Sequence, residues 1–339
     1  MKLLILGGTL FLGRYLVEAA LALGHEVTLF NRGKTNPNLF SDVEHLQGDR
    51  DSNLEALTGR SWDAVIDTSG YVPRIVRTSA ELLKDAVDHY TFISSISVYA
   101  DFKKRGLDEK APVQTLENDS EENKQEAYGA LKALCEQTVE QIMPGRVLTV
   151  RPGLIVGPHD PTGRFTYWVR RVAEGGEVLV PDKPSCSVQF IDVRDLAQWV
   201  VQMVEAQQTG VYNATRLRDT LTLGNLVECC KQVTGSDAHF TWVSEAFLEQ
   251  WQVEAWTELP LWVPNTLRGF LAVDSTQAIQ AGLKFRPLAQ TIRDTWTWNK
   301  ASVLNQSYDQ RMNAKIGLER SREQQLLEAW HNLFQPDAT

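Results

Sequence analysis

The sequence is poor in cysteine. Four of its 339 residues are cysteines, and they form neither a Cys-x-x-Cys pair nor a cluster with histidine. This scarcity argues against a disulfide scaffold and a structural zinc site, and it favours a reducing compartment. We therefore expect no bound metal.

Positive charge is also scarce, and long apolar runs are absent. Lys and Arg number 34 against 43 Asp and Glu, a formal charge of −9. Non-specific nucleic-acid binding needs a broad basic surface, so no nucleic-acid partner is expected. No segment reaches roughly 18 uninterrupted apolar residues, which excludes a predicted membrane span. Glycines interrupt the apolar start at 3–13 and no small-residue cleavage site follows, so we expect a cytoplasmic protein.

Strand-like and helix-like segments alternate over the first 160 residues. Strand-like segments lie at 3–6, 27–30, 43–47, 64–67, 90–94 and 147–150, and helical spacing occurs at 11–23, 76–87 and from Tyr128 onward. Parallel strands need helical crossovers. The alternation therefore predicts an α/β fold with a doubly wound parallel sheet of the Rossmann type.

A glycine-rich turn joins the first strand to the first helix. It reads Gly7-Gly8-Thr9-Leu10-Phe11-Leu12-Gly13. Glycines let backbone amides approach a pyrophosphate, and a helix N-terminus favours negative charge. We predict dinucleotide binding here, with an ordinary turn as the alternative. The predicted cofactor contacts are Gly7, Gly8, Thr9, Phe11, Leu12 and Gly13.

The second strand ends in basic rather than acidic residues. An acidic residue there would bind the ribose 2′-hydroxyl of NAD, whereas this sequence has Asn31, Arg32 and then Lys34. Cationic donors suit a 2′-phosphate. We therefore predict that Asn31 and Arg32 contact the cofactor and that NADP is favoured over NAD. A solvated basic loop is the alternative.

Two Tyr-x-x-x-Lys pairs occur, and their contexts differ. Tyr128 and Lys132 open a sustained helical pattern, which places phenol and ammonium on one helix face. A nearby cation favours phenolate and brings proton exchange closer to neutral pH. Tyr99 and Lys103 instead lie between a strand and a polar loop, where the spacing has no fixed geometry. Tyr128 and Lys132 are the predicted catalytic pair.

These motifs occur in an order that resembles the extended short-chain dehydrogenase/reductases, including the NAD(P)-dependent epimerase/dehydratase group. The resemblance covers roughly residues 1–300 and is strongest to an atypical subgroup with a GG-x-x-x-x-G turn, variously labelled isoflavone-reductase-like, sugar dehydratase-like or RNA-binding. The matching segments are 7–13, 48–49, 94–99, 128–132, 151–158 and 190–195.

The resemblance implies roles for individual residues. Ser95 would hydrogen-bond the substrate oxygen, Tyr128 would exchange its proton, and Lys132 would bind the nicotinamide ribose and lower the tyrosine pKa. Asp49 would accept a hydrogen bond from the adenine amine. The other implied cofactor contacts are Arg50, Thr68, Ser69, Gly70 and Pro152. A homodimer is usual for such relatives.

Three positions depart from the family pattern. Leu10 replaces the middle glycine of the turn, so its side chain must point away from a pyrophosphate. Leu154 and Val188 stand where nucleotide-sugar enzymes usually have Asn and Arg. The last two changes weaken the prediction of a nucleotide-sugar substrate.

We predict a dinucleotide-binding domain over 1–156, to which 189–217 returns, a substrate-binding cap from 157–188 and 218–299, and a polar helical tail over 300–339. The predicted function is NADP-dependent hydride transfer between nicotinamide and a carbonyl or alcohol carbon of a small, sugar-like molecule. One alternative is a redox-neutral nucleotide-sugar epimerase or dehydratase with recycled NAD. Another is an RNA-binding or regulatory protein that retains the fold.

Overall fold

The computed structural model describes residues 1–116, 127–304 and 316–333. The chain divides into two compact units, each assembled from three chain segments. The first unit is Met1–Ile155, Ile191–Leu217 and Val273–Phe285, and the second is Val156–Phe190, Arg218–Ala272 and Arg286–Thr339. Within the described ranges, no helix has the length and apolar character needed to cross a membrane.

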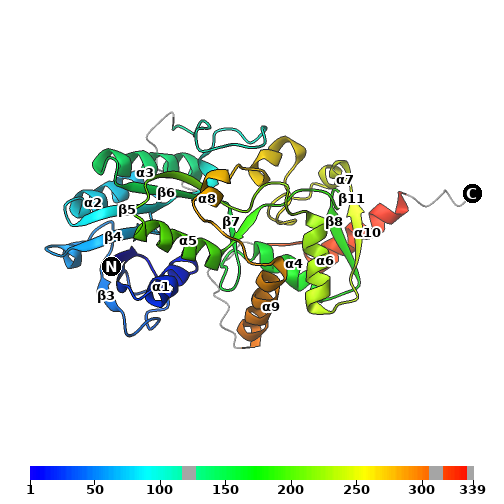
Figure 1. The fold of residues 1–339 in the computed structure, drawn as a ribbon. Coiled ribbons are helices and arrows are strands. Elements are labelled where there is room, and N and C mark those ends of the chain that lie inside the picture. The colour runs from blue at the N-terminus through cyan, green and yellow to red at the C-terminus, as the bar shows by residue number, and fades with distance from the viewer. Residues whose placement is uncertain (117–126, 305–315, 334–339) are drawn as a thin grey trace, which may run out of the picture. The chain divides into compact units, whose positions relative to one another are not determined.

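Seven parallel strands form the sheet of the first unit, in the order β10-β6-β5-β4-β1-β2-β3 (Figure 1). The prediction of a doubly wound parallel sheet is confirmed, because the order runs outward in both directions from β1. The strands are β1 (Lys2–Leu6), β2 (Glu26–Asn31), β3 (Glu44–Gln47), β4 (Trp62–Asp67), β5 (Val87–Ile93), β6 (Val147–Pro152) and β10 (Gly210–Ala214).

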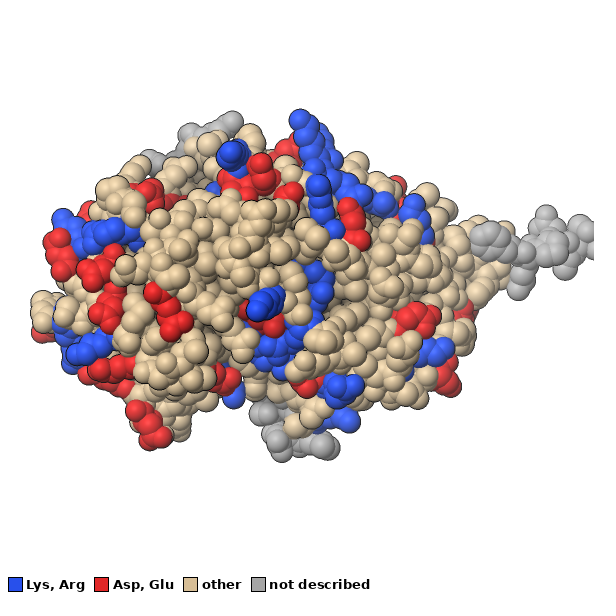
Figure 2. All heavy atoms as spheres, in the orientation of Figure 1, with Lys and Arg blue, Asp and Glu red and all other residues tan. Residues whose placement is uncertain are grey.

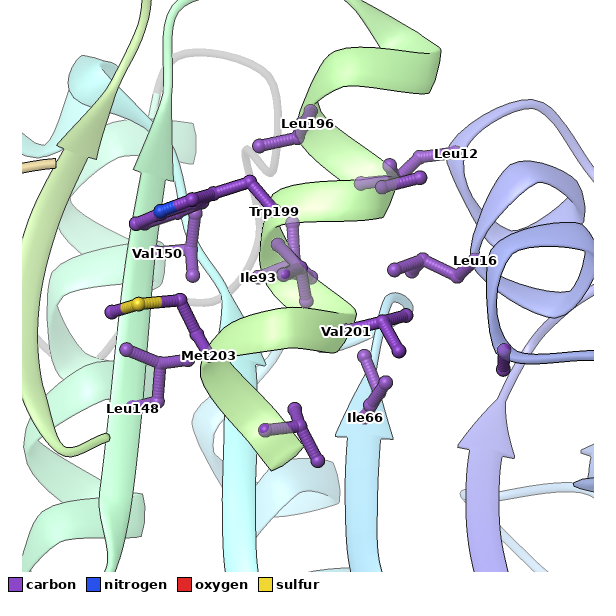
Figure 3. Close-up of a cluster of buried hydrophobic side chains, with 14 of the residues drawn as sticks. Leu12, Leu16, Ile66, Ile93, Leu148, Val150, Leu196, Trp199, Val201 and Met203 are labelled. Atoms are coloured by element: carbon purple, nitrogen blue, oxygen red, sulfur yellow. The ribbon is translucent and has the colours of Figure 1, made fainter. Parts of the chain in front are cut away.

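Helices cover both faces of this sheet. Helices α1 (Leu12–Ala22) and α5 (Val193–Glu205) lie on one face, and α2 (Pro73–Leu83) and α3 (Tyr128–Ile142) lie on the other (Figure 1). Strand β1 is apolar from Leu3 to Leu6 because these side chains alternate between the two cores. Leu3 and Ile5 pack in the core with α1 and α5, and Leu4 packs in the other core. Figure 3 shows the first core, with Leu16 of α1 and Trp199 of α5 above the strands.

Short helical elements complete the first unit. They are the 3-10 helices η1 (Glu55–Leu57) and η2 (Ile96–Val98) and the helix α8 (Thr276–Gln280). The short strands β7 (Leu154–Val156) and β9 (Phe190–Asp192) pair where the chain passes between the units.

Helices and a two-stranded parallel sheet form the second unit. Strand β8 (Glu177–Pro181) pairs with β11 (His239–Val243). The helical elements are α4 (Arg164–Ala173), α6 (Leu223–Thr234), α7 (Glu245–Gln250), η3 (Asn265–Leu271), α9 (Leu288–Leu304) and α10 (Arg320–Asn332).

Two predicted boundaries need correction. Residues 273–285 were expected in the cap but belong to the first unit. There the Asn213 side chain donates to the Asp274 carbonyl at 2.9 Å, and the Trp199 indole donates to the Ala281 carbonyl at 3.1 Å. These long-range hydrogen bonds leave no trace in the local pattern from which the boundary was drawn.

The tail expected over 300–339 is, where described, part of the second unit. Glu323 of α10 is almost fully buried and bonds the Arg171 guanidinium of α4 at 2.7 Å. The same carboxylate accepts from the Leu179 amide of β8 at 3.0 Å. Residues 305–315 and 334–339 of the expected tail lie outside the described residues.

Candidate active site

The turn between β1 and α1 has a backbone path that depends on glycine. Gly7 and Gly8 have φ angles of 116° and 90°, which L side chains rarely adopt. A Cβ on Gly13 would lie 2.8 Å from the Gly8 amide nitrogen, so the turn and the first turn of α1 touch backbone to backbone. The Leu10 side chain is 48% exposed, as expected for a residue that points out of the turn.

Asparagine side chains hold the turn in place. The Asn31 amide donates to the Gly7 carbonyl at 3.1 Å, and its oxygen accepts from the Gly33 amide at 2.9 Å. Asn36 donates to the Thr9 carbonyl at 2.8 Å. The Asn31 side chain, predicted as a cofactor contact, therefore links the turn to the end of β2.

The residues at this turn fit a dinucleotide. A Cβ on Gly13 would collide with the Gly8 backbone, so this glycine lets the turn pack closely against α1, and Phe11 precedes α1 at φ 37° without a side-chain cap. The first turn of α1 contains no acidic residue that would repel a pyrophosphate. Leu12 and Thr9 are both buried beside the turn. Arg32 is exposed at the adjacent end of β2.

Asp49 and Arg50 follow β3 and take different positions. An oxygen of the partly buried Asp49 carboxylate accepts from the Asp51 amide at 3.1 Å. The Arg50 guanidinium is buried and binds both oxygens of the fully buried Asp67, at 2.7 and 2.8 Å. Arg50 was predicted to contact the cofactor, but its charged group is used inside the first unit.

Residues 68–70 follow β4 directly beside the glycine turn. The Thr68 hydroxyl donates to the Leu6 carbonyl at 2.8 Å, and a Cβ on Gly7 would collide with the same hydroxyl. The Ser69 amide donates to Asp67 at 2.9 Å. The structure thus brings Thr68 and Ser69 to the end of β1, as the motif order predicts. Pro152 ends β6 two strands away, buried and in register with Ala214.

Ser95 and Tyr128 meet through their hydroxyl groups. Ser95 precedes η2, where its oxygen accepts from the Ser97 amide at 3.1 Å. It also forms a side-chain hydrogen bond with Tyr128 that favours the phenolate. Tyr128 is the first residue of α3.

Lys132 lies one turn further along α3 and is almost fully buried. Its Nζ donates to the Gly70 carbonyl at 2.8 Å and to the Ile93 carbonyl at 2.6 Å. Lys132 therefore joins the segment after β4 and the end of β5 to α3. Burial lowers the pKa of Lys132 from its usual 10.5 to about 8.

The expected effect of Lys132 on Tyr128 is absent from the structure. The pKa of Tyr128 is raised to about 12, mainly because the phenol is buried and secondly because Tyr71 lies beside it; the Ser95 hydrogen bond opposes both. Burial and the two carbonyls hold the ammonium of Lys132, and it is not among the groups that lower the phenol pKa. The expectation of a lowered pKa was therefore wrong for the chain alone.

Sequence reasoning missed two residues near the predicted catalytic pair, Tyr128 and Lys132. Glu136, one turn after Lys132, accepts from the Ser94 hydroxyl and binds Arg151 with both oxygens, at 3.0 and 2.7 Å. Its spacing of four from Lys132 is a signal that could have revealed it. Tyr71 lies with its ring centroid 6.5 Å from that of Tyr128. It carries no motif.

The fold and this site define a Rossmann-type α/β protein. Its motifs meet at the ends of β1, β4 and β5. The model of the NAD dependent epimerase/dehydratase family matches residues 3–215. The chain therefore belongs to that family, within the extended short-chain dehydrogenase/reductase superfamily.

One curated relative and many solved structures resemble the chain. The chloroplast stem-loop binding protein of 41 kDa b from Arabidopsis thaliana is 26% identical over 252 residues, which are 69% of this chain. The match spans 63% of that protein's length, less than two thirds of it.

Among solved structures, the UDP-Glc/GlcNAc 4-epimerase of Campylobacter jejuni is similar with a TM-score of 0.67 at 14% identity, covering 88% of this chain and 99% of that one. The UDP-glucuronic acid 4-epimerase of Bacillus cereus, solved in complex with NAD, has a TM-score of 0.65 at 15% identity, covering 89% of this chain and 99% of that one. At such identities the likeness shows the shared fold.

Proposed function

We propose that the protein transfers a hydride between the nicotinamide of NADP and a carbonyl or alcohol carbon of a small, sugar-like substrate, with Tyr128 as acid and base. One observation carries the proposal: the Tyr128 phenol is hydrogen-bonded to Ser95 and begins the helix on which Lys132 is buried one turn later. A phenol, a hydroxyl donor and a fixed ammonium at one strand edge suit proton exchange with a substrate oxygen.

Each residue has a separate task in this mechanism. The dinucleotide, when bound, supplies or accepts the hydride at its nicotinamide ring. In the direction of reduction, the Tyr128 hydroxyl gives its proton to the oxygen of the substrate carbonyl, and the resulting phenolate regains a proton from solvent. Ser95 donates a hydrogen bond to the same oxygen. With a pKa of about 12, Tyr128 is protonated at neutral pH, the form that a proton donor requires.

Lys132 fixes the position of the helix that carries Tyr128. Its ammonium is fixed by two backbone carbonyls, so it keeps α3 at a constant position relative to the ends of β4 and β5. By the family resemblance it would also hold the nicotinamide ribose. Gly70, whose carbonyl accepts from Lys132, would line the same part of the cofactor.

The preference for NADP is supported by the end of β2. Arg32 and Lys34 are exposed there, and no acidic residue occupies the position that would bind a ribose 2′-hydroxyl. Arg32→Ala should weaken NADPH binding roughly tenfold, the loss of one charge-assisted hydrogen bond, and leave NADH binding unchanged. Isothermal titration with both nucleotides measures this. Arg77→Ala, another exposed arginine, is the matched control. Equal losses for both nucleotides would refute the 2′-phosphate assignment.

A redox-neutral reaction uses the same residues. An epimerase or dehydratase would return the hydride to the substrate, so the dinucleotide would stay bound and unchanged. The family match supports this alternative. A dehydratase would also need an acid–base pair after the catalytic serine, whereas buried Ile96 and Ser97 stand there. The dehydratase variant is therefore the less favoured.

RNA binding is the second candidate function, because the curated relative is named for stem-loop binding. The net charge of −9 opposes it. On the part of the first unit that faces the reader in Figure 2, acidic and basic side chains are interspersed rather than gathered into a basic field. An electrophoretic shift assay with an RNA hairpin at physiological salt separates the two candidates. Tight binding without NADPH turnover would favour the RNA-binding function.

Native mass spectrometry of the protein as purified tests the principal proposal. We expect retained NADP and, if the reaction is redox-neutral, a second small ligand; the same spectrum reports how many chains assemble. Turnover of that ligand is then compared between the wild type and Tyr128→Phe. A variant that retains full turnover would refute the role of Tyr128, and a protein that binds no dinucleotide would refute the proposed function.

A further inference from the structure

Tyr71 is an aromatic side chain that stays 55% exposed beside the catalytic phenol. Its ring centroid lies 6.5 Å from that of Tyr128, at an interplanar angle of 39°. A single exposed aromatic side chain is ordinary on a protein surface, and the position of this one beside Tyr128 is what distinguishes it. A molecule bonded to the Tyr128 hydroxyl would therefore lie next to Tyr71.

The position of the Tyr71 ring is fixed from the protein side. Lys132 places its Nζ 5.2 Å from the ring centroid, and that ammonium is itself held by the carbonyl of Gly70, the preceding residue. On the other side in sequence, Val72 is buried and Pro73 begins α2. The backbone on both sides of Tyr71 is thus anchored, and the ring is a preorganised surface.

The outer part of Tyr71 has no partner among the described residues. Its hydroxyl forms no hydrogen bond with any described residue, although Lys132 lies against its ring. The other exposed aromatic residue of the described chain, Trp251, also has a ring and a cation beside it, Phe247 and Arg322 at 5.9 and 6.0 Å; the neighbours of Tyr71 differ in being Tyr128 and Lys132. Tyr71 combines a fixed ring with an available face and hydroxyl.

We propose that Tyr71 is a substrate-contacting residue that selects substrates carrying a ring next to the reacting carbon. The substrate ring stacks on the exposed face of Tyr71, while the oxygen to be protonated reaches Tyr128. A pyranose or an aromatic ring meets this requirement, and an open-chain alcohol of similar polarity does not. The inference rests on the proposed function, because it takes Tyr128 as the group that meets the substrate oxygen.

Saturation-transfer NMR on the full-length protein with NADP tests this selection. The probes are methyl β-D-glucopyranoside and benzyl alcohol, which carry rings, and propan-2-ol, which does not. We expect saturation transfer to at least one ring probe and none to propan-2-ol. In Tyr71→Leu, which keeps apolar bulk but lacks a flat ring, the dissociation constant for the ring probe should rise roughly fivefold. Tyr71→Phe should retain most of the affinity.

Controls separate this inference from general damage and from the proposed function. Trp251→Leu, the same loss of an exposed ring elsewhere, should leave probe binding unchanged, and NADPH affinity should stay within twofold of the wild type in Tyr71→Leu. Absence of transfer to both ring probes in the wild type, or unchanged affinity in Tyr71→Leu, would overturn the inference. A loss of NADPH affinity would assign Tyr71 to the cofactor instead, which also overturns it. Tyr128→Phe should still bind the ring probe, so full turnover by that variant would refute the proposed function alone.

Discussion

The same Tyr-x-x-x-Lys spacing occurs in two regions of the first unit, with different structural outcomes. Tyr99 is fully buried, and its hydroxyl donates to Asn213 at 2.6 Å and accepts from Arg151 at 3.2 Å. Lys103, four residues later, is exposed. Tyr128 keeps a hydroxyl hydrogen-bonded to Ser95, and its Lys132 is the buried partner of two strand ends.

The comparison shows that spacing acquires chemical meaning only through the element that carries it. Helix α3 places Tyr128, Lys132 and Glu136 on one face, directed to the strand ends. The region after β5 has no such helix, so Tyr99 joins a buried polar network and its lysine faces solvent. We propose that the Tyr128 phenol takes part in the reaction, whereas the Tyr99 phenol belongs to a buried hydrogen-bond network.

The largest expected effect separates the two phenols. Tyr128→Phe should lower turnover by on the order of 10³-fold, because it removes the acid–base group. Tyr99→Phe should leave turnover within a few-fold of the wild type. Steady-state rates at saturating NADPH measure both. Equal losses in the two variants would erase the functional distinction between these tyrosines.

Breaking the buried ion pair between Glu136 and Arg151 should lower the free energy of unfolding the most. Glu136→Gln leaves the Arg151 guanidinium buried without its charged partner, so the free energy of unfolding should fall by about 3–5 kcal/mol. Urea denaturation followed by circular dichroism measures this. Glu44→Gln, which breaks an exposed pair with Arg60, should have little effect. A small loss in Glu136→Gln would mean that this buried pair contributes little to stability.

Removing the hydroxyl of Tyr99 or of Tyr128 compares what each contributes to stability. Tyr99→Phe deletes the bonds to Asn213 and Arg151, so the free energy of unfolding should fall by about 1–3 kcal/mol. Tyr128→Phe, whose hydroxyl has Ser95 as its partner, should lose less. Thermal and urea denaturation of both variants measure the difference. The reverse order of losses would contradict the structural role assigned to Tyr99.

The smallest effect concerns pH and the two lysines. Folding lowers the pKa of Lys132 from 10.5 to about 8, so between those values the unfolded chain binds more protons than the native protein. The contribution of Lys132 to stability should therefore rise with pH from about 8, by roughly 1–2 kcal/mol by pH ~9.5.

This effect is measured by urea denaturation midpoints at pH ~8 and pH ~9.5. The proteins compared are the wild type, Lys132→Met and Lys103→Met. The increase should vanish in Lys132→Met and persist in Lys103→Met. Identical pH slopes in all three proteins would show that burial does not shift the pKa of Lys132.

The sequence supports prediction of the first unit because its strands are locally encoded. The predicted strand 27–30 lies within Glu26–Asn31, and the predicted strand 64–67 lies within Trp62–Asp67, since each is an apolar run between polar residues. Strand β8 (Glu177–Pro181) was missed because it pairs with a strand 62 positions later in the sequence, which no local pattern indicates.

Positions in the candidate site could be predicted where a sequence motif determines the backbone. They could not be predicted where a side chain interacts with a residue distant in the sequence. The glycine turn and residues 68–70 lie together because strand ends meet at one sheet edge. Arg50 could not be placed, because its partner Asp67 is 17 residues away and no pattern links them. Tyr71 was missed for a related reason, since exposure and ring contacts are properties of the folded chain.

The buried bond between Arg171 and Glu323 also constrains the order in which the protein can be completed during synthesis. The two residues are 152 positions apart, which is roughly 8–30 seconds of translation. Until α10 has been synthesised, the Arg171 guanidinium lacks its carboxylate partner. A folded second unit would then contain a buried charge that is not neutralised. The first unit has all its segments once residue 285 has left the ribosome. The second unit therefore closes last, and a nascent chain stalled before Glu323 would be the form most exposed to chaperones and proteases.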